Sequence, residues 1–132
     1  MQPFHGNIEE LTLANNNFRQ VIYTGPKSQL VLMSLKPGED IGVETHHKVD
    51  QFFRVEAGEG KAIIGGVEYT LANATAVIVP AGSEHNFINT GLVDLKMYTI
   101  YTPPNHIDGR VHATKADAVA DTEDEAFGEK VI

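Results

Sequence analysis

Short extended segments separated by Gly and Pro turns run through most of this chain, and this rhythm constrains the fold more than any other feature. Apolar and polar residues alternate within many of the segments, as in strands that bury one face. The expected strands are 18–24, 29–35, 43–46, 51–56, 61–64, 67–71, 76–79, 85–89 and 95–101. No stretch between them has the length or period of a crossover helix. The pattern therefore favours an all-β sandwich or barrel.

The C-terminal part has a different composition. Residues 114–127 are rich in Ala, Asp and Glu, and they are predicted to form one or two helical turns, with Thr114 as N-cap and Asp117 in the capping-box position. The acidic residues at its end are expected to be a solvated tail rather than a metal-binding run. They are Asp121, Glu123, Asp124 and Glu125. A single domain over residues 1–132 is expected, with a tail over about 114–132.

Composition narrows the possible partners. The chain has 132 residues, 42% of them hydrophobic, and a formal net charge of -8, which disfavours binding to nucleic acid or to an anionic membrane. It has no cysteine, so disulfides, thiolate zinc sites and cysteine nucleophiles are excluded. The first residues do not resemble a secretory signal, and no apolar run approaches the length of a membrane span. A cytoplasmic protein is the expectation.

Four polar side chains in two separate segments are the candidate metal ligands. Glu44 and His46 are two residues apart, so an extended strand places both on one face. Gln51 follows at an odd spacing, and the polar residues 47–50 are expected to bend the chain so that it rejoins the same interior. His85 follows a Pro-x-Gly turn that aims the next strand back toward the same pocket.

Such a set suits a first-row divalent ion better than calcium or magnesium, because it holds two imidazoles and one carboxylate. Zn, Mn, Fe and Ni are the expected metals, with Gln51 adding a neutral amide oxygen. Without Gln51, two histidines and a carboxylate remain, the facial arrangement of many non-haem iron oxygenases.

The spacing of these residues resembles the first motif of the cupin superfamily, which reads Gly, five residues, His-x-His, three or four residues, Glu, six residues, Gly. The chain has this spacing from Gly38 to Gly58. Glu44 replaces the first His of the motif and Gln51 replaces its Glu. The carboxylate has thus moved from the third ligand position to the first, which keeps the ligand charge.

The second cupin motif is also present in spacing. It reads Gly, five residues, Pro-x-Gly, two residues, His, three residues, Asn. Ala74 stands where the motif begins with Gly, and Pro80, Gly82, His85 and Asn89 match. The resemblance covers about 29–101. It implies a jelly-roll β-barrel with a metal near its mouth, bound by the four candidate ligands.

Residues on the last strong strand are candidates for contact with a substrate. Tyr101 and Tyr98 each offer a hydroxyl, and the sequence does not decide which face of their strand looks inward. Both are therefore candidate catalytic residues. Surface or packing roles are expected for the histidines outside the motifs. These are His5, His106 and His112.

Three functions follow from the resemblance. The preferred one is a metal-dependent isomerase or epimerase acting on a small, oxygen-rich, sugar-like molecule, in which the metal holds adjacent oxygens while a pocket residue moves a proton. A non-haem iron dioxygenase and a non-catalytic ligand-binding module are the alternatives. A homodimer is expected, with residues 2–17 covering an edge strand of the neighbour.

Overall fold

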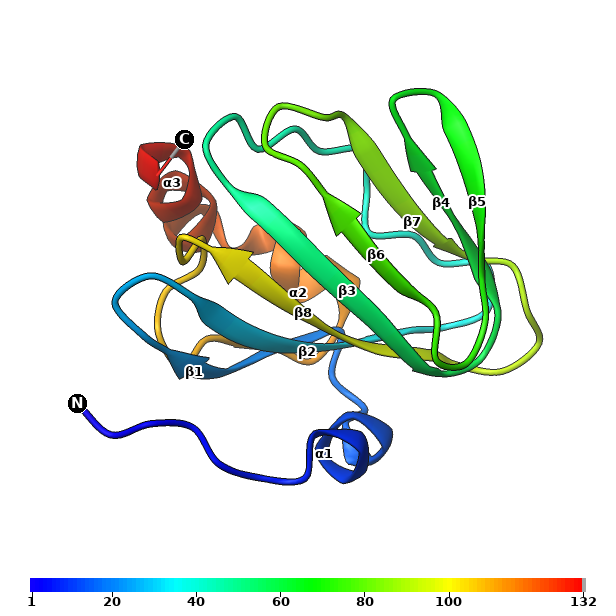
Figure 1. Cartoon of the computed structure of the whole chain (residues 1–132), viewed down its shortest axis with the longest axis horizontal. Coiled ribbons are helices and arrows are strands. Elements are labelled where there is room, and N and C mark those ends of the chain that lie inside the picture. Colours follow the sequence, from blue (N-terminus) through cyan, green and yellow to red (C-terminus); the bar gives the residue numbers. More distant parts are fainter. Residues whose placement is uncertain (132) are drawn as a thin grey trace.

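The computed structural model describes residues 1–131, in which strands are more common than helices (Figure 1). The strands and helices are α1 (Ile8–Ala14), β1 (Arg19–Thr24), β2 (Gln29–Leu35), β3 (Asp50–Ala57), β4 (Gly60–Ile64), β5 (Val67–Leu71), β6 (Ala76–Val79), β7 (His85–Asn89), β8 (Leu95–Thr102), β9 (Val111–His112), α2 (Lys115–Ala120) and α3 (Thr122–Val131). The predicted all-β jelly roll with a short helical C-terminal segment is confirmed. Only 43–46 does not form a full strand.

Two antiparallel sheets enclose the core. One has the order β6-β3-β8-β2-β1-β9 and the other β5-β4-β7. Isolated bridges from Asp40 to Ile88 and from Glu44 to His85 attach the segment before β3 to the open side of β7. This segment therefore brings Glu44 directly opposite His85, although the two residues are far apart in the chain.

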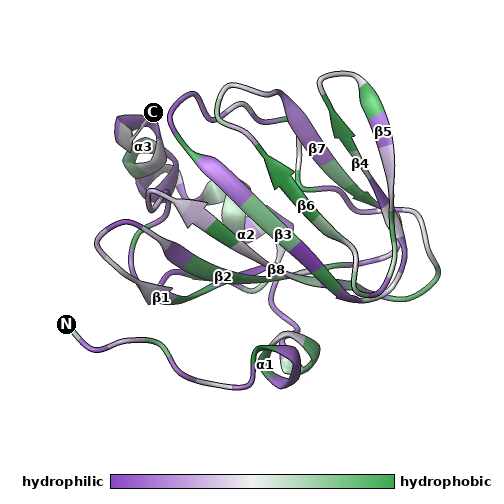
Figure 2. Ribbon diagram, in the orientation of Figure 1, coloured by the Kyte–Doolittle hydropathy of each residue, from purple (hydrophilic) through white to green (hydrophobic). Residues whose placement is uncertain are grey.

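The core between the sheets follows from the alternation of the strands. Along β8 buried residues alternate with partly exposed ones, so one face of the strand points inward. Phe53 of β3 and Phe87 of β7 stack across the two sheets with ring centroids 3.9 Å apart. Figure 2 shows β6 as hydrophobic along its length. The Phe53 and Phe87 rings are both buried in the core, and the Phe87 ring lies edge-on to that of His85, with centroids 6.3 Å apart.

Both cupin motifs contain residues with a positive φ angle. Gly58 has a φ of 90° and lies directly after an irregularity in the pairing of β3 with β8. Ala74, which stands where the second motif has Gly, also has a positive φ, of 68°. That left-handed conformation is costly for a residue with a Cβ. The backbone thus keeps the shape of the motif even where the glycine is missing.

The N-terminal segment is an extended stretch that leads into the short helix α1 (Figure 1). Asn7 caps α1 by accepting a hydrogen bond from the Glu10 backbone amide. The helix contacts β2, β3 and β8, which all belong to the larger sheet of the same chain. This contact explains why β2 is buried along both faces.

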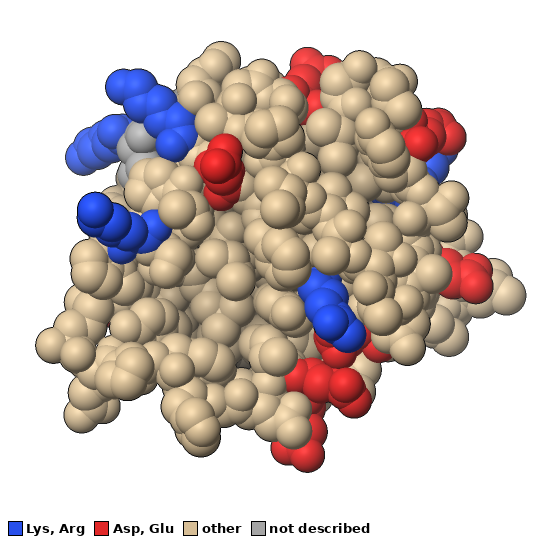
Figure 3. Space-filling view, in the orientation of Figure 1, with Lys and Arg blue, Asp and Glu red and all other residues tan. Residues whose placement is uncertain are grey.

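The homodimer stays a prediction. Charged side chains are scattered over the face seen in Figure 3 and form no broad basic surface there.

The C-terminal segment confirms one prediction and corrects another. Thr114 and Asp117 form the predicted capping box of α2. The acidic residues, however, are not a solvated tail throughout, because Asp124 is only 4% exposed and Asp121 is ion-paired with Arg110 and His112. The partners of these two carboxylates are His106, Arg110 and His112, which all lie in the part of the chain after β8. Within residues 1–131, no helix is both long and apolar enough to cross a membrane.

Candidate metal centre

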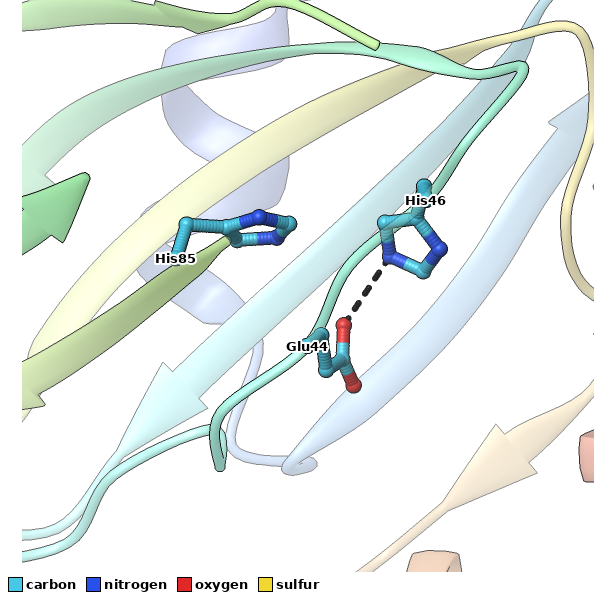
Figure 4. A group of neighbouring side chains, drawn as sticks. All are labelled: Glu44, His46 and His85. Carbon is cyan, nitrogen blue, oxygen red and sulfur yellow. Dashed lines mark hydrogen bonds and ion pairs between the residues drawn. The ribbon is translucent and has the colours of Figure 1, made fainter. Parts of the chain in front are cut away.

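Three of the four candidate ligands lie together at the mouth of the barrel (Figure 4). One ligand atom each from Glu44, His46 and His85 can be chosen so that all lie within 4.8 Å of one another. Glu44 and His85 face each other through the bridge between their backbones, and the amide of Gly82 donates to the carbonyl of His46 at 2.7 Å. The two motifs therefore hold each other in place through backbone hydrogen bonds.

The hydrogen bonds of His85 prepare it to bind a metal. Its Nδ1 lies 3.0 Å from the carbonyl oxygen of Ser83. A carbonyl can only accept, so Nδ1 carries the proton and Nε2 is left with a free lone pair. Burial lowers the pKa of His85, although the Ser83 carbonyl and the charge of Glu44 raise it. The neutral imidazole that a metal requires is therefore favoured near neutral pH.

Glu44 and His46 are hydrogen-bonded to each other where a cation would bind. His46 Nε2 lies 3.0 Å from Glu44 Oε2. Burial raises the pKa of Glu44, but the hydrogen bond from His46 and the positive charge of Arg19 outweigh it and lower the pKa overall. Glu44 is therefore ionised at neutral pH, and its carboxylate can exchange a hydrogen-bond donor for a metal ion.

Gln51 has the burial and the free acceptor expected of a fourth ligand. A bend at residues 47–48 precedes β3, and Gln51, the second residue of that strand, is only 2% exposed. Its Nε2 donates to Thr99 Oγ1 at 3.0 Å, whereas its Oε1 is buried and has no hydrogen-bond partner among the described residues. An orphaned oxygen in a buried site is costly. The donor set therefore fits a divalent metal.

The two candidate catalytic tyrosines lie on opposite faces of β8. Tyr101 is 1% exposed and its ring lies edge-on to His46, with centroids 6.0 Å apart. Tyr98 points to the opposite face of β8, where it packs on Phe52 with centroids 6.0 Å apart. Only Tyr101 is thus close to the candidate ligands.

Tyr101 belongs to a hydrogen-bonded chain that the sequence analysis missed. His106 Nδ1 lies 2.7 Å from Asp124 Oδ2, and His106 Nε2 lies 3.0 Å from the Tyr101 hydroxyl. Burial lowers the pKa of His106, although the Asp124 hydrogen bond raises it. Burial likewise raises the pKa of Tyr101 far above its ordinary value. The neutral forms that result let Nδ1 donate to Asp124 and the tyrosine hydroxyl donate to Nε2.

His106 also faces a cavity of about 550 Å³ that opens beside Glu44 and His46. Residues from α2 and α3, Lys115 and Glu125 among them, form its far wall. The prediction of a surface or packing role for His106 is incomplete, because this buried imidazole lines the cavity as well. A cavity of this size suits a small molecule.

Acid is expected to destabilise the protein through the buried His106. Its ordinary pKa is 6.5 and its folded pKa is lower, so below about pH 6.5 the unfolded chain takes up a proton that the folded chain does not. Stability should therefore be complete above that pH and fall as the pH drops toward the folded pKa, by at most about 1.4 kcal/mol per pH unit. Urea unfolding with a chelator present, between pH 7.5 and 5, measures this slope.

In the variant His106→Gln, the free energy of unfolding should change less steeply with pH over the same range. A slope equal to that of the wild type would contradict the assignment.

Asp124, the carboxylate partner of His106, adds a second loss of stability at lower pH. Burial raises the pKa of Asp124, but His106, the Ile107 amide and the charge of Arg19 together outweigh burial, so the folded pKa lies below 3.8. Its contribution is therefore present above about pH 4 and is lost as the pH falls through the folded value.

Comparison with known proteins shows which family the chain belongs to. Residues 31–101 match the family model of the cupin domain, and the chain belongs to that family. It is 50% identical over 125 residues to the uncharacterized protein YrkC of Bacillus subtilis (strain 168), covering 90% of this chain and 67% of that protein. It is 44% identical over 114 residues to the uncharacterized protein L612 of Acanthamoeba polyphaga mimivirus, covering 83% of this chain and 71% of that protein.

A solved structure shares almost the whole fold. The crystal structure of BH2720 from Bacillus halodurans superposes with a TM-score of 0.89 at 45% identity, covering 90% of this chain and 95% of that one. The similarity to BH2720 covers more of the chain than the match to the family model, which ends at residue 101. It therefore includes much of the chain around the cavity.

Proposed function

We propose that this cupin binds a divalent transition metal through Glu44, His46, Gln51 and His85, and that it is an enzyme acting on a small, oxygen-rich, sugar-like molecule. The observation that carries the proposal is the meeting of Glu44, His46 and His85 within 4.8 Å. The partnerless amide oxygen of Gln51 supports it. Zn, Mn, Fe and Ni all suit this donor set.

Isomerisation or epimerisation is the reaction we prefer. A bound metal would supply Lewis acidity toward oxygens of the substrate. The chain itself would supply a cavity that encloses a small molecule and a hydroxyl that can exchange protons beside it. Tyr101 holds that position because its ring lies against His46 and its hydroxyl bonds to His106, which lines the cavity. Tyr98 has no such position.

Exchange of substrate hydrogen with solvent tests this reaction. The metal-loaded protein is mixed in turn with aldoses, ketoses and sugar acids in D2O and followed by proton NMR. We expect deuterium to enter at the carbon next to the carbonyl, and this exchange to stop in the presence of a chelator. Tyr101→Phe should keep its metal and slow the exchange by about 100-fold or more, as is usual for loss of a group that transfers protons.

Tyr98→Phe is the matched control and should exchange at the wild-type rate, because it removes the same atom from the opposite face of β8. A Tyr101→Phe protein as active as the Tyr98→Phe protein would refute the role of Tyr101. Affinity for a sugar without any exchange, unaffected by chelator, would instead indicate a non-catalytic binding module.

The dioxygenase is the second candidate, because the two histidines and one carboxylate brought together here are the ligands of many non-haem iron oxygenases. Oxygen uptake by protein loaded anaerobically with iron separates the two enzymes. Substrate-dependent uptake would favour the dioxygenase, whereas hydrogen exchange without uptake would favour the isomerase.

A further inference from the structure

Arg19 is a buried cation on the wall of the same cavity. It begins β1, its side chain and backbone together are 6% exposed, and it lines the cavity together with Glu44 and His46. No ion pair joins it to a carboxylate of residues 1–131. Glu44 and Asp124 feel its charge only without direct contact. A buried charge without a direct ion pair is costly, so such residues are normally paired.

Neighbouring side chains fix the guanidinium without neutralising it. His112 Nε2 lies 2.8 Å from Asp121 Oδ2, so Nε2 carries the proton and Nδ1 can accept. That Nδ1 lies 3.4 Å from Arg19 Nη1. The guanidinium carbon also lies 5.3 Å from the centre of the Phe18 ring. Both contacts orient Arg19, and neither brings a negative charge to it.

Most of the donors of Arg19 are left for another group. A guanidinium has five N–H donors. This one contacts His112 Nδ1 and lies close enough to the Tyr101 hydroxyl for a hydrogen bond that lowers the pKa of that tyrosine against the larger effect of burial. The Nε of Arg19 is buried without a partner. Nearby acids already have partners, since Asp124 accepts from His106 and from the Ile107 amide, and Glu44 from His46.

We propose that Arg19 binds a carboxylate of the ligand, so that the substrate of the proposed metal enzyme is a small hydroxy or keto acid rather than a neutral sugar. This step rests on the proposed function. The planar fork of a guanidinium matches a carboxylate in a bidentate manner. A single charge is favoured over a phosphate dianion, because Glu44, Asp124, Glu125 and Glu129 also line the cavity.

Nitrogen-15 NMR of the arginine side chains tests the proposal on metal-free protein. The chain has three arginines, Arg19, Arg54 and Arg110, and the last two are ion-paired to Glu56 and Asp121. Glycolate is the probe, and ethylene glycol is its neutral counterpart. We expect glycolate to shift the Nε–H signal of Arg19 in a saturable manner and to leave the other two in place, while ethylene glycol shifts none.

Variants separate recognition by Arg19 from general attraction of anions. Arg19→Gln and Arg19→Lys should each weaken glycolate binding by about tenfold or more, the effect of losing a charged hydrogen bond. Arg54→Gln is the matched control and should bind as the wild type does. If Arg19→Gln does not fold, as judged by circular dichroism, the wild-type titration and the charge-retaining Arg19→Lys still decide the matter.

Two results would overturn the proposal. One is an Arg19 signal that glycolate leaves unmoved, and the other is tighter binding of inorganic phosphate than of glycolate. Because these titrations contain no metal, a failure here leaves the metal assignment standing. A failure of the metal assignment would appear separately, in the metal content of the purified protein.

Discussion

Protein purified without added metal is expected to contain near-stoichiometric divalent transition metal, and His46→Ala and His85→Ala should each lose most of it. Loss of an outer partner of a metal ligand already weakens binding roughly 10- to 100-fold. Removal of an imidazole that binds directly should cost at least about 100-fold, because His85 presents a prepared Nε2 and His46 lies 3.0 Å from the carboxylate that completes the trio. Elemental analysis of all three proteins measures the difference.

His47→Ala is the matched control, since His47 is the exposed neighbour of a candidate ligand and should not affect metal content. Folding is monitored by circular dichroism, so that loss of metal is not confused with loss of structure. Equal metal content in the wild type and in the His46→Ala and His85→Ala variants would refute the site.

Gly58→Ala is expected to lower the free energy of unfolding by more than about 3 kcal/mol. Two causes act together at this residue. Its φ of 90° disfavours any side chain, and a Cβ added there would lie 2.5 Å from the carbonyl oxygen of Asp94 and 2.9 Å from the Cα of Leu95. Those are backbone atoms of the segment entering β8, so they cannot move aside as the end of a flexible side chain can.

Gly38→Ala isolates the conformational part of this cost. Gly38 has a similar φ of 82°, but a Cβ there would meet nothing within 4 Å. It should cost only about 1–2 kcal/mol, the ordinary penalty of the left-handed conformation. Urea unfolding of both variants gives the comparison. Equal losses would show that the approach of Asp94 and Leu95 does not limit what residue 58 can be.

Local patterns were sufficient to predict most of the strands, although they missed β9 and predicted a strand at 43–46 that is only an isolated bridge. The ranges of β2 and β5 were predicted without error because apolar and polar residues alternate or cluster between Gly and Pro turns, and both signals are local. The turn at residues 47–48 could likewise be inferred, because the odd spacing between His46 and Gln51 requires a bend if both side chains are to face the barrel interior. The structure contains that bend.

The rest of the cavity could not be predicted by the same means. Arg19 belongs to no motif, and its position depends on β9 pairing with β1, which brings His112 beside it. His106 and Asp124 meet because the chain after β8 turns back to the barrel mouth, and no local pattern of residues specifies that path. The acidic cluster was mistaken for a solvated tail for this reason, since its partners lie in a different part of the chain.

The division of the cavity between two parts of the chain has a consequence for evolution. All four candidate ligands lie between residues 31 and 101, the stretch shared with the family at large, whereas Arg19, His106 and the helices opposite the ligands lie outside it. Replacement of those flanking pieces would therefore change which molecule is accepted and leave the proposed metal ligands unchanged. Cupins that differ in substrate would then be expected to diverge first at their two ends.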